Sequence, residues 1–107
     1  MKRVILESPY AGDVERNLDY GRACLRDSLM RGASPIASHM LYTQPGVLDD
    51  DNPAERKLGI DLGLSWCEVS DGTVVYADYG VTRGMYQGID RAHSLGKLVE
   101  YRHILPQ

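Results

Sequence analysis

The sequence has no apolar run long enough to cross a lipid bilayer, and its N-terminus lacks the hydrophobic stretch of a signal peptide. It has no excess of basic residues either, because 12 lysines and arginines stand against 15 aspartates and glutamates, a formal net charge of -3 at pH 7. The two signs are interleaved along the chain, so no basic surface for a nucleic-acid backbone is expected. We therefore expect a soluble, cytoplasmic protein, in the host cytoplasm for a viral source, that binds neither a membrane nor a nucleic acid.

Cysteine is also scarce. Cys24 and Cys67 have no CxxC spacing and fall in segments of helical pattern, which indicates buried, reduced thiols rather than a disulfide or a metal site. The acidic run Asp49-Asp50-Asp51 lacks the ligand spacing of a calcium loop and precedes a helix start, so we interpret it as a solvated loop. No metal and no cofactor is expected.

A chain of 107 residues is long enough for one hydrophobic core and too short for two, so residues 1–107 are expected to form one domain. Four short apolar segments predict strands, over residues 2–7, 34–40, 73–77 and 98–101. Three helices are predicted between them, over residues 14–31, 53–69 and 82–95. In the middle helix, Leu58, Leu62, Trp66 and Val69 follow one face, which is expected to pack in the core or against a second copy of the chain.

Strands that alternate with helices imply a parallel sheet with right-handed crossovers. We therefore predict the α/β class, as a single flavodoxin- or Rossmann-like domain whose four-stranded parallel sheet has the order 2-1-3-4 and helices on both faces. The strand ends then open on one edge of the sheet. The loops at Ser8-Pro9-Tyr10, 39–51 and 78–85 are expected to be neighbours there.

The segment from Val74 to Met85 reads as a buried strand, a glycine-containing loop and the first turn of a helix. Parallel α/β folds bind ligands at such a place, because the free N–H groups and the dipole of the helix attract phosphates and other acceptors. Arg83 lies beside those N–H groups and suits a phosphate or ribose oxygen. Tyr10 can stack on a base or merely cover the sheet edge. His39 can donate to a ligand or serve a structural role.

Five motifs follow one another along almost the whole chain: Ser8-Pro9-Tyr10, Arg16-Asn17, Pro35 with His39, Asp78-x-Gly80 with Gly84-Met85, and Ala92 with Leu95-Gly96-Lys97-x-Val99. Their order and spacing resemble the nucleoside 2-deoxyribosyltransferase-like family, which includes small relatives from bacteria and bacteriophages. The resemblance implies a nucleoside or nucleotide site at the sheet edge and a homodimer or larger homo-oligomer. Together with Arg83, proposed from its place at a helix start, the resemblance gives these expected site residues: Ser8, Pro9, Tyr10, Arg16, Asn17, His39, Asp78, Gly80, Arg83, Gly84 and Met85.

The sequence departs from that family at the glutamate that attacks or stabilises the sugar's anomeric carbon. The position expected for it is Gly88 or, on another anchor, Tyr86, and neither is a carboxylate. Glycosyl transfer needs such an oxygen nucleophile, for which Asp78 is the first candidate and Asp90 the second. Asp78 can equally serve to bind the backbone amides of its own loop.

Three functions remain open. The chain could bind a nucleotide or an ADP-ribose-type molecule without turnover, as a viral accessory protein that sequesters a host signal would. It could be an N-glycosidase or transferase that uses Asp78, or an interaction module whose pocket is vestigial. We prefer the binding protein, because the expected glutamate is missing while other site-type residues are present.

Overall fold

The computed structural model describes residues 2–106 and contains four strands and four α-helices. The strands are β1 (Arg3–Glu7), β2 (Ser34–Ile36), β3 (Gly72–Tyr76) and β4 (Leu98–Arg102). The helices are α1 (Val14–Met30), α2 (Ser38–Leu41), α3 (Pro53–Leu64) with the 3-10 turn η1 (Ser65–Val69), and α4 (Arg83–Ser94).

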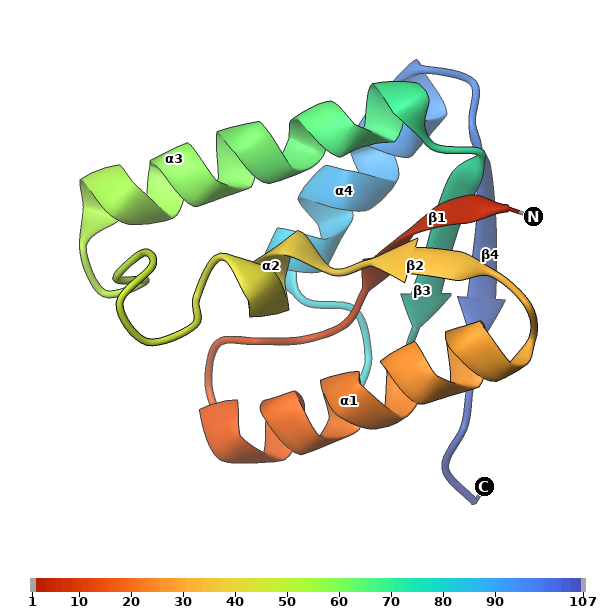
Figure 1. Cartoon of the computed structure of the whole chain (residues 1–107), viewed down its shortest axis with the longest axis horizontal. Coiled ribbons are helices and arrows are strands. Elements are labelled where there is room, and N and C mark those ends of the chain that lie inside the picture. Colours follow the sequence, from red (N-terminus) through yellow and green to blue (C-terminus); the bar gives the residue numbers. More distant parts are fainter. Residues whose placement is uncertain (1, 107) are drawn as a thin grey trace.

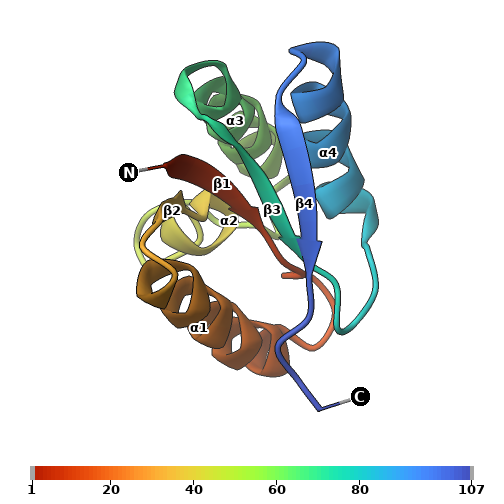
Figure 2. The same ribbon diagram turned by 90° about the vertical axis from the view of Figure 1, so that its right-hand side faces the viewer.

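The sheet has the order β2-β1-β3-β4, and every neighbouring pair is parallel (Figure 1). In the view along the other axis, α1 covers one face of the sheet while α3 and α4 cover the opposite face (Figure 2). The predicted α/β fold, strand order and two-sided helix cover are therefore confirmed. The centre of β1, Val4-Ile5-Leu6, and all of β3 are buried because both faces of these strands are covered.

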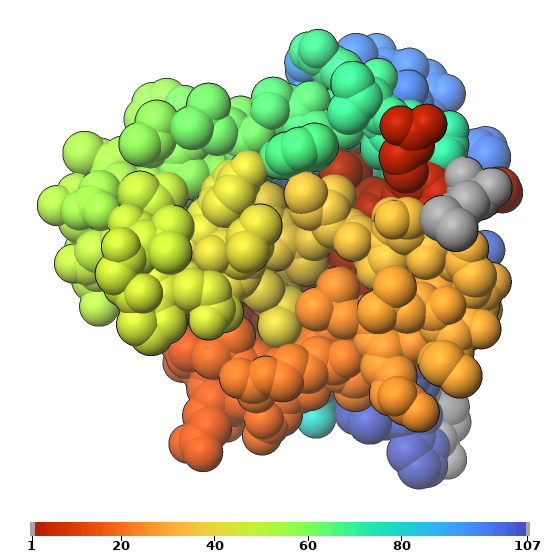
Figure 3. Space-filling model, viewed as in Figure 1, coloured from red at the N-terminus to blue at the C-terminus, as the bar shows by residue number. Residues whose placement is uncertain are grey.

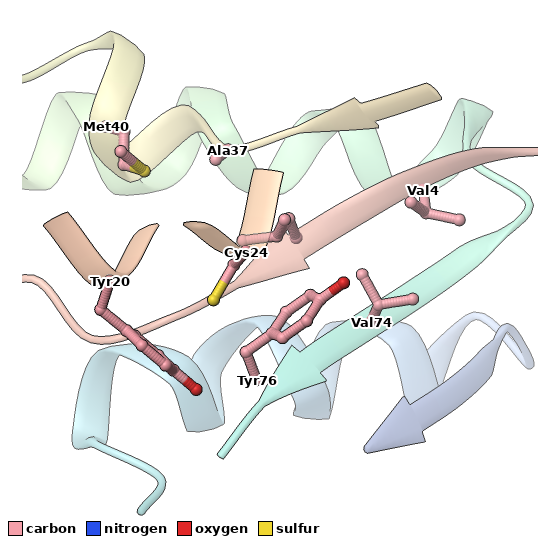
Figure 4. Packing of buried hydrophobic residues seen from close by; sticks show 8 residues of the cluster. Val4, Tyr20, Cys24, Ala37, Met40, Val74 and Tyr76 are labelled. Carbon is pink, nitrogen blue, oxygen red and sulfur yellow. The ribbon is translucent and has the colours of Figure 1, made fainter. Parts of the chain in front are cut away.

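Alternate residues of the central strands point to opposite layers, as in any strand. Val4 and Leu6 of β1 and Val74 and Tyr76 of β3 face α1, where they join Tyr20, Cys24, Ala37 and Met40 in one cluster (Figure 4). Val75 points to the other layer and packs with Met85 and Ile89 of α4. By the same alternation, Glu7 faces the α3–α4 layer. The face to which a strand-end side chain points therefore decides whether it can reach a site shared with α3 and α4.

The second predicted strand was too long. Residues 34–40 were expected to be extended, but β2 ends at Ile36 and the chain turns into the short helix α2. Ala37 and Met40 then pack into the α1-side cluster. Burying these two side chains stabilises a helical turn more than further strand pairing at the sheet edge would. As a result, His39 lies in a helix and not at the end of a strand.

The middle helix also differs from the prediction. It ends at Leu64, and η1 carries the chain to Val69. The face that includes Leu62 and Val69 does not pack in the core, since these side chains are 53% and 67% exposed, and its packing against a second copy stays a prediction. The helix turns its glycines inward: a Cβ at Gly59 would lie 3.1 Å from Leu48 Cδ1, and one at Gly63 would meet Ser38 Oγ. Close approach to α2 and its loop therefore determines the buried face. Within residues 2–106, no helix is both long and apolar enough to span a bilayer.

Candidate functional site

A cavity of about 230 Å³ lies at the C-terminal edge of β1, between the α2–α3 connection, α3 and the start of α4. Its floor is made by side chains of the central strands, among them Ile5, Glu7 and Thr73. The chain from α2 to the start of α3, coloured yellow to yellow-green, lies beside α3 in the space-filling view (Figure 3). Three segments that are distant in sequence thus enclose one space.

Six of the eleven predicted site residues line this cavity: Ser8, Tyr10, His39, Arg83, Gly84 and Met85. The other five, Pro9, Arg16, Asn17, Asp78 and Gly80, are not part of its lining. The structure therefore brings together the loop after β1, the segment from α2 to α3 and the start of α4. The beginning of the third loop, with Asp78 and Gly80, is not part of the lining.

Ser8 and His39 form the best-defined polar contact of the cavity. Ser8 Oγ lies 2.7 Å from His39 Nε2, a hydrogen bond whose direction depends on the imidazole tautomer. Burial lowers the pKa of His39 to about 4, so the ring is neutral at pH 7. A neutral ring can accept a hydrogen bond from the Ser8 hydroxyl through one nitrogen while the other carries an N–H. The pair offers polar recognition without adding charge.

The start of α4 forms another wall. Thr82 caps the helix, and its Oγ1 accepts a hydrogen bond from the Met85 N–H at 3.3 Å. The first N–H groups of a helix have no acceptor within the helix, so those of Arg83 and Gly84 are available to a ligand. A Cβ added at Gly84 would have nothing within 4 Å, so the backbone there is open. The Arg83 guanidinium has no ion-pair or hydrogen-bond partner among residues 2–106.

Arg16 and Asn17 support the cavity wall from outside. The buried Asn17 amide donates to the carbonyls of Tyr10 at 2.9 Å and Ala11 at 3.1 Å. Arg16 donates to Asn17 Oδ1 and stacks over the Tyr79 ring, 4.0 Å from its centroid. These contacts fix the loop after β1, and through it the position of Tyr10.

Asp78 lies on the α1 side of the sheet and binds the C-terminal segment. Its carboxylate accepts from the Tyr20 hydroxyl at 2.6 Å and from the backbone N–H groups of Ile104 and Leu105 at 3.0 Å each. Burial acts to raise the pKa of Asp78, but these hydrogen bonds outweigh it and the pKa is lowered. The catalytic role considered for Asp78 remains a prediction without geometric support. Gly80 has φ +84°, so it serves the turn after β3.

The structure adds a residue that the sequence reasoning missed. Glu7, the last residue of β1, lines the cavity, and its carboxyl has no hydrogen-bond partner among residues 2–106. Burial raises the pKa of Glu7 to about 8. A charged residue directly after the buried run Val4-Ile5-Leu6 was the available signal. Tyr42 and Arg56 also line the cavity, where Arg56 pairs with Asp50 at 2.8 Å.

Comparisons with known proteins agree with this architecture. A family model described as "Domain of unknown function (DUF7768)" matches residues 2–102. A solved structure of a 2-deoxyribosyltransferase from the psychrotolerant bacterium Bacillus psychrosaccharolyticus is similar, with a TM-score of 0.64 and 18% identity, over 97% of this chain and 77% of that one. That protein is described as a biocatalyst for the synthesis of nucleosides. The likeness shows a shared fold. No curated protein matches the sequence.

Proposed function

Since the chain belongs to the family of the Domain of unknown function DUF7768, whose description names no activity, we propose from the cavity itself that the protein binds a nucleoside or nucleotide without converting it. One observation carries the proposal. An aromatic ring from Tyr10, a free guanidinium from Arg83 and the open N-terminus of α4 surround the same cavity as the Ser8–His39 pair. These groups match the base, the phosphate and the sugar of one ligand.

The phosphate belongs at the start of α4, where the free N–H groups and the dipole attract an anion and Arg83 adds a charge-assisted hydrogen bond. The base belongs against Tyr10, whose ring can stack on it. The sugar lies between them, over the strand ends. With a volume of about 230 Å³, the cavity is smaller than most small-molecule sites, so part of a mononucleotide, and more of an ADP-ribose-type molecule, would lie at its mouth.

Binding without turnover is favoured by the chemistry of the carboxyl groups. Gly88 offers no nucleophile on α4, and the Asp78 carboxylate is engaged by Tyr20 and the C-terminal segment. A nucleophilic carboxyl must be ionised, whereas burial raises the pKa of Glu7 to about 8. A protein that captures a nucleotide signal, as a viral accessory protein would, needs affinity and not catalysis.

A second candidate function is N-glycosidase or transferase activity, and the placement of Glu7 in the cavity is the observation that favours it. Glu7 could attack or stabilise the anomeric carbon once a ligand has lowered its pKa. The two candidates share the site and differ only in what happens to the ligand.

The test is calorimetric titration with adenosine, AMP, 2′-deoxyadenosine 5′-monophosphate and ADP-ribose, followed by heat denaturation and chromatography of the released ligand. We expect AMP or the deoxynucleotide to bind and to be recovered intact. Arg83→Ala should weaken binding of the phosphorylated probes by about 1.5–3 kcal/mol, the range for a charge-assisted hydrogen bond. The matched control is Arg22→Ala, on the exposed face of α1. Accumulation of free adenine would establish the glycosidase instead. If no probe binds, the interaction module with a vestigial pocket is the candidate function that remains.

A further inference from the structure

The carboxyl group of Glu7 occupies the space in front of Gly88. A Cβ added at Gly88 would lie 2.6 Å from Glu7 Cδ and 3.2 Å from Oε1, and it would collide with Oε2. Any side chain at position 88 would therefore displace the Glu7 carboxyl. Gly88 is itself buried in the first half of α4. Its lack of a side chain is what allows a carboxyl group from β1 to reach this wall of the cavity.

The floor beside Glu7 carries a second polar group without a partner. Thr73 pairs with Ile5 in the sheet register, faces the same layer as Glu7, and is only 2% exposed. Thr73 Oγ1 is buried and has no hydrogen-bond partner among residues 2–106. Burying an unpaired polar group such as the Thr73 hydroxyl costs stability. The Glu7 carboxyl beside it is half-buried and also has no partner among residues 2–106, so a ligand in the cavity would supply a partner to both groups.

We propose that Glu7 is the ligand-recognising carboxyl of this cavity, supplied by β1 in the space that Gly88 leaves open, and that it hydrogen-bonds a sugar hydroxyl of the bound nucleoside or nucleotide. The proposal rests on the proposed function, since it names a contact of that same ligand. Thr73 is the neighbouring group on the floor that can share the hydroxyl.

The protonation of Glu7 suits this role. Because burial raises its pKa to about 8, the side chain is mostly the neutral acid at pH 7 and can both donate and accept a hydrogen bond. A neutral group also avoids repelling a phosphate in the same cavity. The other charged or titratable groups in the lining include His39 from α2, Asp50 from the connection, Glu55 and Arg56 from α3, and Arg83 from α4. Asp50 pairs with Arg56, and Glu55 accepts from the Asp49 N–H.

The experiment moves the carboxyl from strand to helix. AMP and 2′-deoxyadenosine 5′-monophosphate are titrated by calorimetry at pH 7 and pH 9 into the full chain and into Glu7→Ala, Glu7→Gln and the double variant Glu7→Ala with Gly88→Glu. Glu15→Gln, in the exposed first turn of α1, is the matched control. Thermal melts are recorded for every variant.

Glu7→Ala should weaken binding at pH 7 by about tenfold or more, corresponding to one lost buried hydrogen bond, and still melt at least as high as the parent. The double variant should recover most of that loss, because its glutamate enters the vacated space. Glu7→Gln should bind nearly as well at pH 7 and, unlike the parent, lose little at pH 9. Loss of binding in Glu7→Ala with recovery in the double variant excludes a merely structural role.

Glu7→Ala binding with unchanged affinity would overturn the assignment of Glu7 while leaving the proposed function standing. A folded double variant that binds no better than Glu7→Ala would overturn the claim that a carboxyl from position 88 can replace that of Glu7. Were Glu7→Ala to fail to fold, a Glu7→Gln variant whose affinity falls in parallel with the parent from pH 7 to pH 9 would overturn the role of the acid. A parent chain that binds neither nucleotide would instead overturn the proposed function, and this inference with it.

Discussion

Ser8 and His39 are 31 residues apart in the sequence, yet their side chains meet at 2.7 Å inside the cavity. The contact joins the end of β1 to α2, two elements that the parallel sheet places side by side. It holds a neutral imidazole at the edge of the ligand space. The consequences for stability and for binding can be measured separately.

Acid should destabilise the protein through His39. Its pKa is lowered from 6.5 to about 4 in the folded state, so the stability that neutral His39 contributes is present above pH 6.5 and is lost as the pH falls toward 4. The full loss is about 3 kcal/mol from a shift of this size. Urea unfolding of the parent and of His39→Gln at pH 7, 5.5 and 4 isolates this contribution from that of the carboxylates. Parallel pH profiles for the two proteins would contradict the assignment.

Asn17→Ala should be costly although Asn17 does not itself line the cavity. It removes the amide that donates to the carbonyls of Tyr10 and Ala11 and leaves both without that donor. We expect a loss of about 2–3 kcal/mol in the free energy of unfolding, measured in urea, and weaker nucleotide binding because the loop loosens. Asp19→Ala on the same helix removes only an exposed ion pair to Arg22 and should change stability by less than about 1 kcal/mol. Equal losses of stability in Asn17→Ala and Asp19→Ala would refute the claim that Asn17 holds the loop after β1 in place.

Asp78→Ala distinguishes a stabilising role of Asp78 from a role in ligand binding or cleavage. The variant loses the acceptor for Tyr20 and for the N–H groups of Ile104 and Leu105, so we expect destabilisation of about 1.5–3 kcal/mol. Affinity for AMP should stay within about twofold, since Asp78 lies outside the cavity lining. Thermal melts and calorimetry on the same samples check both statements. Unchanged stability with abolished binding or cleavage would return Asp78 to the site.

The open face of α3 and η1 leads to a prediction about assembly. Leu58, Leu62, Trp66 and Val69 are all exposed there, and a contiguous apolar surface of this kind favours association. We expect a homodimer in sedimentation equilibrium at micromolar concentration, and a monomer after Leu62→Glu. Leu29→Glu, an equally exposed change at the end of α1, is the control. A monomeric parent chain would refute the prediction.

The order of elements and the strand order were readable from the sequence because the signals are local. Buried runs such as Val4-Ile5-Leu6, the Asn52 cap and the glycines after α1 and α4 define segments without reference to the rest of the fold, and right-handed crossovers then restrict the topology. The α2 turn was not readable in this way. Ala37 to Met40 is apolar enough for a strand, and only its packing against α1 shows that it is helical.

The cavity lining could be predicted in part from positions along the chain, but not where the direction of a side chain decides. Tyr10, in the loop after β1, and Arg83, at the start of α4, line the cavity as their positions suggested. Glu7 was missed because its importance depends on the alternation of β1 and on the missing side chain at Gly88, which belongs to an element 81 residues away. Asp78 was ranked first among the candidate catalytic carboxylates because it follows β3, but its alternation with Tyr76 turns it toward α1.

The most direct test of the account is amide NMR of the labelled protein titrated with AMP. Binding in the cavity should shift the signals of residues 7–10, 38–43 and 83–88 at one common dissociation constant, leave those around Asp78 and Ile104 unmoved, and return AMP unchanged after a day. Shifts centred on the α1 face, or no shifts at millimolar AMP and deoxynucleotide, would contradict the claim that this cavity is a nucleotide site. A growing signal of free adenine would contradict binding without turnover.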